Sequence, residues 1–232
     1  MKFIHVKDYD ELSFKAAQIM LDECKENNKT NICLASGDSP KKTYELFTKE
    51  VLAQQIDTRF MTITKLDEWV GIERDSELSC EKYIRTMVVD PLHLQDRFIS
   101  FLPDGNPEEE VNKVNAELSK KPIDLCVLGF GRNGHLGLNE PASHLFAHAH
   151  QIQISEVTKH HPMIKANHSI EYGMTIGMKD ILDSKKVLLL MSGEGKKKLY
   201  QEFLTEKIST QLPASFLWLH SNTIVIVRDD QF

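Results

Sequence analysis

An apolar run, Ile123–Leu128 (IDLCVL), leads directly into a glycine-rich turn, Gly129–Pro141 (GFGRNGHLGLNEP), and the interpretation of the chain starts from this stretch. A compact apolar run of this length is typical of a buried strand. Glycines after such a strand let the backbone approach a ligand closely. The turn also carries His135, which can move a proton near neutral pH, and Glu140, which can orient and charge-balance the imidazole. The spacing therefore predicts a catalytic loop.

Two other interpretations of the turn are open. Gly129, Gly131 and Gly134 fit the dinucleotide-binding pattern G-x-G-x-x-G loosely. That pattern normally comes early, opens a helix and is followed by an acid about 20 residues on, whereas this turn lies in the middle of the chain and runs into Asn139–Pro141. The plainer alternative is an ordinary turn with a surface histidine, and the coincidence of glycines, histidine, glutamate and an upstream strand argues against it.

Strand-like and helix-like segments alternate along the chain, which favours an α/β fold. Strands are predicted over residues 3–6, 31–35, 60–66, 98–101, 123–128, 187–191 and 224–227, and helices over residues 9–25, 40–49, 81–89, 107–119 and 196–204. This order predicts a three-layer, Rossmann-like architecture, an open and mostly parallel sheet with helices on both faces. No linker, repeat or low-complexity segment divides residues 1–232, so we expect a single domain.

Composition narrows the class of protein. The formal net charge of -6 argues against nucleic acid as a partner. No run approaches 18 apolar residues, so no membrane span is expected, and the N-terminus lacks the apolar segment of a signal peptide. The four cysteines, Cys24, Cys33, Cys80 and Cys126, form no C-x-x-C pair. They are expected to be reduced thiols in a cytoplasmic protein.

Three further loops follow predicted strands, at the edge where α/β folds bind ligands. Residues 36–40 combine hydroxyls, a glycine and a helix start, which suits a phosphate, although ordinary N-capping would use the same residues. Asp67 and Glu68 come at the end of another predicted strand, and they are either functional carboxylates or acids exposed to solvent. In residues 192–196, a lysine can reach a phosphate as a point charge. The candidate phosphate-binding residues are Ser36, Gly37, Asp38, Ser39 and Lys196.

With these loops in view, the chain resembles the glucosamine-6-phosphate deaminase family, which is similar in fold to the 6-phosphogluconolactonases. The resemblance runs over nearly all 232 residues and is carried by Ser36–Pro40, Leu66–Gly71, Gly131–His135 with Asn139–Pro141, and Pro213–His220. The lactonases resemble the Gly-His part but lack the Asn-Glu-Pro that follows it.

The resemblance implies that an aldose amino sugar phosphate becomes a ketose phosphate plus ammonia. His135, held by Glu140 and Asn133, matches the family's ring-opening set, and Asp67 matches its enolisation base. A carboxylate suits that role because its conjugate acid can return the proton. Gly134 and Lys165 are further substrate-binding candidates. The partner is a small amino sugar phosphate, and no metal or organic cofactor is expected.

Within the family, residues 136–141 and 216–220 look most like the galactosamine-6-phosphate isomerase (deaminating) branch. The expected substrate is then galactosamine 6-phosphate and the product tagatose 6-phosphate, with glucosamine 6-phosphate, giving fructose 6-phosphate, as the alternative. The two substrates differ only at the C4 hydroxyl, for which Trp69, Leu138 and Trp218 are the candidate contacts. The oligomeric state cannot be read from the sequence.

The sequence departs from the glucosamine branch in ways that affect the site. Asn133 stands where some members have aspartate, and Asp38 stands where a second glycine is common. An acid next to a phosphate is unfavourable unless it points away. No arginine occurs between Arg132 and Arg228, so the arginine that helps bind phosphate in glucosamine enzymes is missing. The basic residues considered as its replacement are Lys159, His160, His161 and Lys165.

Two alternatives to the deaminating isomerase remain, and a histidine-rich segment invites a separate metal-binding interpretation. A lactonase-type sugar phosphate hydrolase is disfavoured by Asn139 and Glu140, and a silent sugar-phosphate sensor is disfavoured by the intact catalytic set. Metal binding by His144, His148 and His150 would need positions four apart to share a helix face, and no carboxylate or cysteine completes that set.

Overall fold

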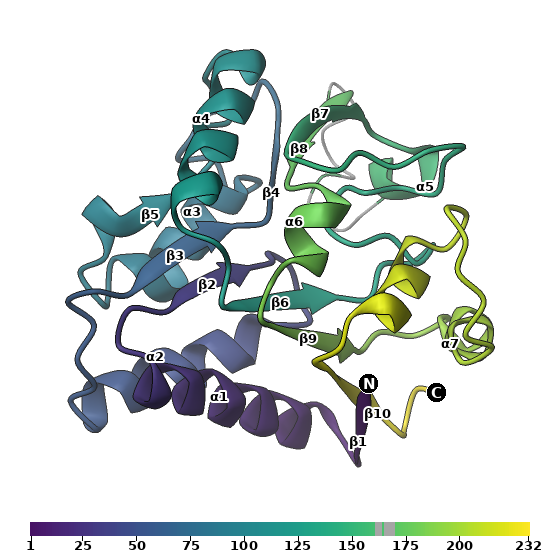
Figure 1. Ribbon diagram of the computed structural model, residues 1–232, viewed down its shortest axis with the longest axis horizontal. Coiled ribbons are helices and arrows are strands. Elements are labelled where there is room, and N and C mark those ends of the chain that lie inside the picture. The colour runs from purple at the N-terminus through teal and green to yellow at the C-terminus, as the bar shows by residue number, and fades with distance from the viewer. Residues whose placement is uncertain (161–163, 165–169) are drawn as a thin grey trace.

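The computed structural model describes residues 1–160, 164 and 170–232. Its main sheet has seven strands in the order β1-β10-β9-β6-β2-β3-β5, and every neighbouring pair is parallel (Figure 1). The strands of this sheet are β1 (Lys2–Val6), β2 (Asn31–Leu34), β3 (Thr62–Lys65), β5 (Phe98–Ile99), β6 (Leu125–Gly129), β9 (Lys186–Met191) and β10 (Thr223–Arg228).

Helices cover both faces of the sheet. The helices are α1 (Tyr9–Glu26), α2 (Lys41–Ala53), α3 (Cys80–Ile84) continued by the π-helical turn η1 (Arg85–Val89), the 3-10 turn η2 (Gln95–Arg97), α4 (Pro107–Lys120), α5 (Glu156–Lys159), α6 (Met178–Leu182), α7 (Lys197–Phe203) and the 3-10 helix η3 (Pro213–Leu219). In Figure 1, α1 and α2 lie below the sheet, whereas α4 and α6 lie above it.

The side chains of β9 show why the sheet is buried on both sides. Leu188 and Leu190 pack in the apolar cluster formed with α1 and α2, and Val187 and Leu189 pack in the cluster formed with α4 and α6. Successive side chains of a strand point to opposite faces, so a continuous apolar run is what a sheet covered by helices requires. The predicted α/β fold with helices on both faces is confirmed.

A second, antiparallel sheet lies above the main one in Figure 1 and was not predicted. Its order is β4-β8-β7, with β4 (Asp67–Trp69), β8 (Tyr172–Thr175) and β7 (His150–Gln153). β4 has only three residues and β7 reads HQIQ, so neither carries the apolar alternation that signals a strand. This sheet matters for the site, because Asp67 pairs with Thr175 at its edge.

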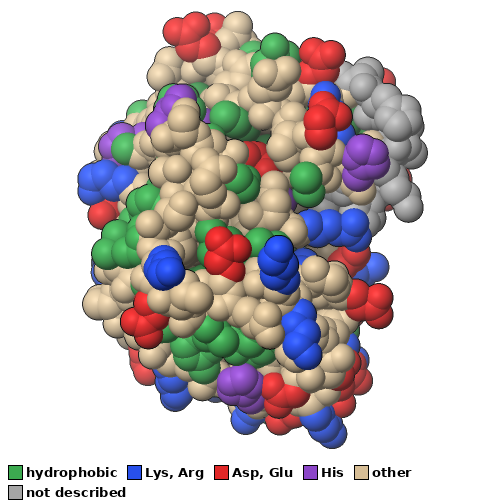
Figure 2. All heavy atoms as spheres, turned by 90° about the vertical axis from the view of Figure 1, so that its right-hand side faces the viewer, with side chains coloured by type: hydrophobic (Ala, Val, Ile, Leu, Met, Phe, Trp, Pro, Cys, Tyr) green, Lys and Arg blue, Asp and Glu red, His purple; other side chains and the backbone are tan. Residues whose placement is uncertain are grey.

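No helix in the part of the chain that the structure describes is long and apolar enough to span a bilayer. Figure 2 shows the face at the right of Figure 1, where acidic and basic side chains are mixed. This face carries no broad surface of one charge.

Candidate active site

The carboxyl ends of β2, β3, β6, β9 and β10 meet at one edge of the sheet, and a cavity of about 360 Å³ lies there. Parallel strands present their carboxyl ends at the same edge, which is where ligands bind in open α/β sheets. Seven of the residues predicted from the sequence line this cavity: Ser36, Gly37, Asp38, Ser39, Asp67, His135 and Lys196. Loops separated by up to 160 positions in sequence are thus brought to one hollow.

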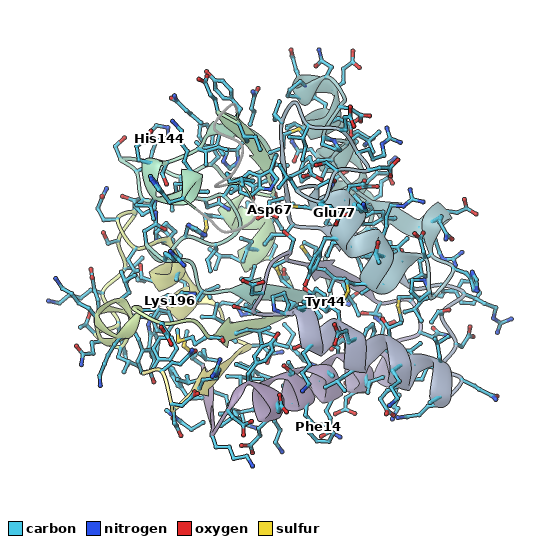
Figure 3. The ribbon with its side chains drawn as sticks, turned by 180° about the vertical axis from the view of Figure 1, so that it is seen from behind. Phe14, Tyr44, Asp67, Glu77, His144 and Lys196 are labelled. Atoms are coloured by element: carbon cyan, nitrogen blue, oxygen red, sulfur yellow. The ribbon has the colours of Figure 1, made fainter. Side chains whose placement is uncertain are left out.

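Asp67 lies where the chain leaves β3 and begins β4, near the middle of the molecule (Figure 3). Burial raises the pKa of the Asp67 carboxyl, and the charge of Glu68 raises it further. His135, Lys65 and Cys80 offset part of this rise, and the pKa is about 7. The Oδ1 atom of Asp67 is buried and has no hydrogen-bond partner among the described residues. A carboxylate with a free oxygen and a near-neutral pKa is suited to take and return a proton.

His135 is held by a polar cluster on its inner side. Its Nδ1 lies 3.6 Å from Glu140 Oε2 and has no hydrogen-bond partner in the described structure. Asn133 Nδ2 donates to the same oxygen at 2.7 Å, and the Thr158 hydroxyl donates to the other one. Burial alone raises the pKa of Glu140, but His135 and the hydrogen bonds from Thr158 and Asn133 lower it to about 2. The Glu140 carboxyl is therefore ionised at neutral pH, next to the imidazole.

The position of the His135 side chain requires a glycine at position 131. A Cβ there would come within 2.3 Å of the imidazole Cδ2, so any side chain would displace the ring. Gly134 is needed for a different reason, because its φ is +79° and a Cβ would lie 2.2 Å from Leu212 Cδ1. Gly134 is buried, and its role in substrate binding stays a prediction.

The loop at residues 36–40 lines the cavity and makes no side-chain cap for the helix that follows it. α2 starts at Lys41 after Pro40, and Pro40 has no side chain that can cap the helix. The N-capping alternative is therefore wrong for this loop. The amides of Lys41 and Lys42 donate instead to the Asp38 carbonyl at 3.4 Å and to the Tyr9 hydroxyl at 3.2 Å. Ser36 Oγ donates to the sulfur of Cys80 at 2.9 Å. Asp38 is exposed, and its backbone carbonyl accepts a hydrogen bond from the Tyr9 hydroxyl at 2.7 Å.

Lys196 is buried just beyond the end of β9. Its Nζ donates to the carbonyl of Phe130 and, at 2.8 Å, to that of Ser192. Burial and the like charge of Arg132 lower the pKa of Lys196 to about 8. Lys196 thus remains mostly charged at neutral pH, next to a second cation.

The cavity includes basic and aromatic residues that the sequence analysis did not identify as site residues: Tyr9, Arg132 and Arg228. Of the suggested replacements for the missing arginine, Lys159 Nζ bonds the Glu156 carboxylate at 2.7 Å and His160 Nδ1 contacts the Glu156 carbonyl at 2.7 Å. Neither lines the cavity as far as the chain is described. His161 and Lys165 lie outside the described residues.

The residues proposed to distinguish the C4 hydroxyl serve packing instead. Trp69 and Leu138 belong to one buried apolar cluster. Trp218 lies against Phe3 and Phe203, with ring centroids 6.0 and 5.6 Å away. None of the three lines the cavity within the described chain, so no role in substrate choice follows from their positions.

The three histidines considered for metal binding do not share a helix. His148 Nδ1 contacts Asp180 Oδ1 at 2.8 Å, His150 begins β7, and His144 lies in the irregular segment before it. Across residues 1–160, 164 and 170–232, no group of three or more His, Cys, Asp or Glu side chains is arranged to hold a metal ion.

Comparison with known proteins fits this geometry. A family model described as glucosamine-6-phosphate isomerases/6-phosphogluconolactonase matches residues 8–226. The chain belongs to this family. The family resemblance predicted from the sequence is thus confirmed, and the catalytic loop, Asp67 and the loop at residues 36–40 all lie within the matched region.

Individual relatives cover almost the whole chain. A protein of Escherichia coli K12 named "Putative deaminase AgaI" is 42% identical over 96% of this chain and 90% of its own length. A glucosamine-6-phosphate deaminase of Clostridium perfringens ATCC 13124 is 32% identical over 99% of this chain and 98% of its own. A solved monomeric glucosamine-6-phosphate deaminase superposes with a TM-score of 0.91 at 29% identity, over 99% and 98% of the two chains.

The lactonase fold is also similar. The 6-phosphogluconolactonase of Trypanosoma brucei superposes with a TM-score of 0.78 over 97% of this chain and 95% of that one, at 18% identity. At that identity the likeness concerns the fold alone.

Proposed function

We propose that this protein is a galactosamine-6-phosphate isomerase (deaminating), which converts galactosamine 6-phosphate and water to tagatose 6-phosphate and ammonia. The reaction class, deaminating isomerisation of an amino sugar phosphate, follows from the family and its deaminase relatives. One observation supports the assignment most directly: Asp67 and His135 line the same cavity as the loop at residues 36–40 and Lys196.

Ring opening is the first step. The substrate enters as a closed ring, so a proton must leave the C1 hydroxyl and a proton must reach the ring oxygen. His135 carries out this exchange with its Nε2, because Nδ1 faces Glu140 at 3.6 Å. The ionised Glu140, fixed by Asn133 and Thr158, holds the imidazole in its orientation.

Isomerisation and loss of ammonia follow on the open chain. The Asp67 carboxylate removes the proton from C2 and the substrate ammonium gives a proton to O1, which together yield a neutral enolamine. The Asp67 carboxylic acid then returns its proton to C1. The product of this transfer is the iminium at C2. Water adds to that carbon, the C–N bond breaks, and ammonia leaves with the ketose phosphate. Asp67 ends in the form in which it began, and the residues act only as proton carriers.

The choice of galactosamine over glucosamine rests on sequence. Residues 136–141 and 216–220 resemble the galactosamine branch. The identity of 42% to AgaI, against 32% to the clostridial glucosamine enzyme, supports a place outside the glucosamine branch. Glucosamine 6-phosphate remains the alternative substrate. The lactonase alternative has weaker support, since the solved lactonase shares only 18% identity.

Ammonia release from the two amino sugar 6-phosphates tests this proposal. We expect a higher kcat/KM with galactosamine 6-phosphate than with glucosamine 6-phosphate. Each value is measured by coupling ammonia to glutamate dehydrogenase, with 6-phosphogluconolactone hydrolysis as a parallel assay. Equal or reversed values reject the galactosamine assignment and keep the reaction class. Lactone hydrolysis without ammonia release rejects both.

The pKa of Asp67 predicts how the rate depends on pH. The base must be ionised to accept the C2 proton, and its pKa is raised to about 7. We therefore expect kcat/KM to rise roughly tenfold per pH unit below this value and to level off above it. Titration of the substrate amine and phosphate by NMR gives the correction for the substrate's own ionisation. A corrected profile that stays flat down to pH 5 contradicts the assigned base.

A further inference from the structure

Arg228, the last residue of β10, lines the cavity from a side that carries no recognised family motif. Its side chain is only 16% exposed. Nε and Nη2 donate to the Asp230 carboxylate at 3.0 and 2.6 Å, and Nη1 donates to Ser192 Oγ at 3.2 Å. The guanidinium is therefore fixed in position by two different segments of the chain.

Tyr9 connects this guanidinium to the loop at residues 36–40. The Arg228 guanidinium carbon lies 5.7 Å from the centre of the Tyr9 ring. The Tyr9 hydroxyl donates to the Asp38 carbonyl at 2.7 Å and accepts from the Lys42 amide at 3.2 Å. Because these contacts run from β10 through α1 to the start of α2, the cation and the helix start border the same space.

Ser192 connects Arg228 to the buried lysine. The Ser192 carbonyl accepts from Lys196 Nζ at 2.8 Å, while its hydroxyl accepts from Arg228. Arg132 lines the same cavity, and its charge contributes to lowering the pKa of Lys196. Three cationic side chains thus border one cavity, and the repulsion between Lys196 and Arg132 is relieved when an anion binds between them.

We propose that Arg228 binds the 6-phosphate of the substrate, together with Lys196 and the loop at residues 36–40. This inference rests on the proposed function. It assigns a phosphate contact to the end of β10, and Arg132 and Arg228 are the two arginines on the cavity wall within the described chain. The planar guanidinium suits this task because its fork matches phosphate oxygens and carries a permanent charge.

Binding of inorganic phosphate tests the inference without turnover. We expect Arg228→Ala to weaken phosphate binding, measured by calorimetry, by about 10–100-fold, the usual range for a hydrogen bond to a charged group. Arg228→Lys should lose less, because it keeps the charge but not the fork. Arg59→Ala is the matched control, since Arg59 also binds an aspartate two residues away through Nε and Nη2 but is 79% exposed and not on the cavity wall.

A second variant distinguishes phosphate binding from a structural role. If Arg228 acted only by anchoring the chain end, Asp230→Asn would reproduce the loss of phosphate affinity. Asp230→Asn keeps one acceptor oxygen for the guanidinium, leaves the bond to Ser192 in place and removes a negative charge beside the cavity. We therefore expect that Asp230→Asn does not weaken phosphate binding, while Arg228→Ala raises KM for the amino sugar phosphate more than it lowers kcat. Equal phosphate affinity in wild type and Arg228→Ala, no phosphate binding to the wild type, or the same loss in Asp230→Asn overturns the inference.

The proposed function and the role of Arg228 can be disproved independently of each other. Normal ammonia release together with unchanged phosphate affinity in Arg228→Ala removes the role of Arg228 and keeps the proposed function. Absence of ammonia release together with phosphate binding that depends on Arg228 removes the proposed function and keeps Arg228 as a phosphate ligand.

Discussion

Asp67→Asn is expected to lower kcat for ammonia release by about 10²–10⁴-fold, the usual contribution of a positioned acid or base. An amide cannot accept the C2 proton, so the exchange of this hydrogen with solvent deuterium stops as well. NMR of the substrate in D₂O measures that exchange independently of ammonia release. Asp104→Asn is the control, because Asp104 is an exposed residue paired with Arg74 at 3.2 Å. Exchange at the wild-type rate in Asp67→Asn contradicts the base assignment.

The same substitution is expected to stabilise the folded protein at high pH. The pKa of Asp67 is about 7 in the folded protein, against an ordinary value of 3.8 for aspartate. Between these values the folded state binds more protons than the unfolded state, so this group costs stability as pH rises, and the cost is complete above pH 7. Asparagine carries no such charge. We expect Asp67→Asn to melt above wild type at pH 8 and level with it near pH 4, which separates lost chemistry from lost folding.

The sequence identified the parts of the fold whose strands are buried runs. The run at residues 187–191 was predicted within one residue of β9, because it is continuous and apolar. The predicted helix at residues 81–89 corresponds to α3 and the π-helical turn η1, whose different hydrogen bonding no periodicity signals. The three strands of the small sheet were missed because they are short or polar, and their pairing depends on contacts between distant segments.

The candidate site also contains residues that the sequence locates and residues that it does not. Asp67 follows an apolar strand directly and His135 lies in the glycine-rich loop after another one, so the rule that ligands bind at carboxyl strand ends locates them from sequence. Arg228 ends β10 and satisfies the same rule, but it belongs to no glycine-rich loop and was overlooked. Tyr9 could not be found in this way, since it opens α1 and reaches the cavity only through the packing of α1 beside α2.

A buried ion cluster lies close to Asp67. The sequence shows its charged residues but does not indicate that they are buried together. Lys65 Nζ donates to Glu68 Oε2 at 2.7 Å, to Glu81 Oε2 at 3.0 Å and to the Phe101 carbonyl at 2.6 Å. The side chains of Lys65 and Glu68 are 1% and 0% exposed. Two carboxylates share one ammonium. Burial by itself lowers the pKa of Lys65, but the two carboxylates outweigh burial, so the pKa of Lys65 lies above its ordinary value. The lysine is therefore charged.

Glu68 is held more firmly than an ion pair alone would hold it. Its carboxylate also accepts from the backbone amides of Trp69, Cys80 and Glu81 at 2.9, 3.1 and 2.7 Å. The cluster thus fastens the start of α3 to β4, the strand that begins with Asp67. Loss of the lysine leaves two buried carboxylates facing each other without a counterion.

Lys65→Met is expected to cost about 3–5 kcal/mol of unfolding free energy, the range for breaking a buried ion pair on one side. Urea denaturation at pH 8 measures the loss, and Lys120→Met is the matched control. Lys120 pairs with Glu117 at 2.9 Å but is 68% exposed, so its loss should stay below about 1 kcal/mol.

If Lys65→Met yields too little folded protein, Glu81→Gln is the second variant. It leaves the pair of Lys65 and Glu68 in place and should unfold cooperatively with a smaller loss of unfolding free energy. The Lys65 charge also helps lower the pKa of Asp67, so the rate profile of Lys65→Met should shift to higher pH. A loss equal to that of Lys120→Met would mean that the cluster does not hold the base in place.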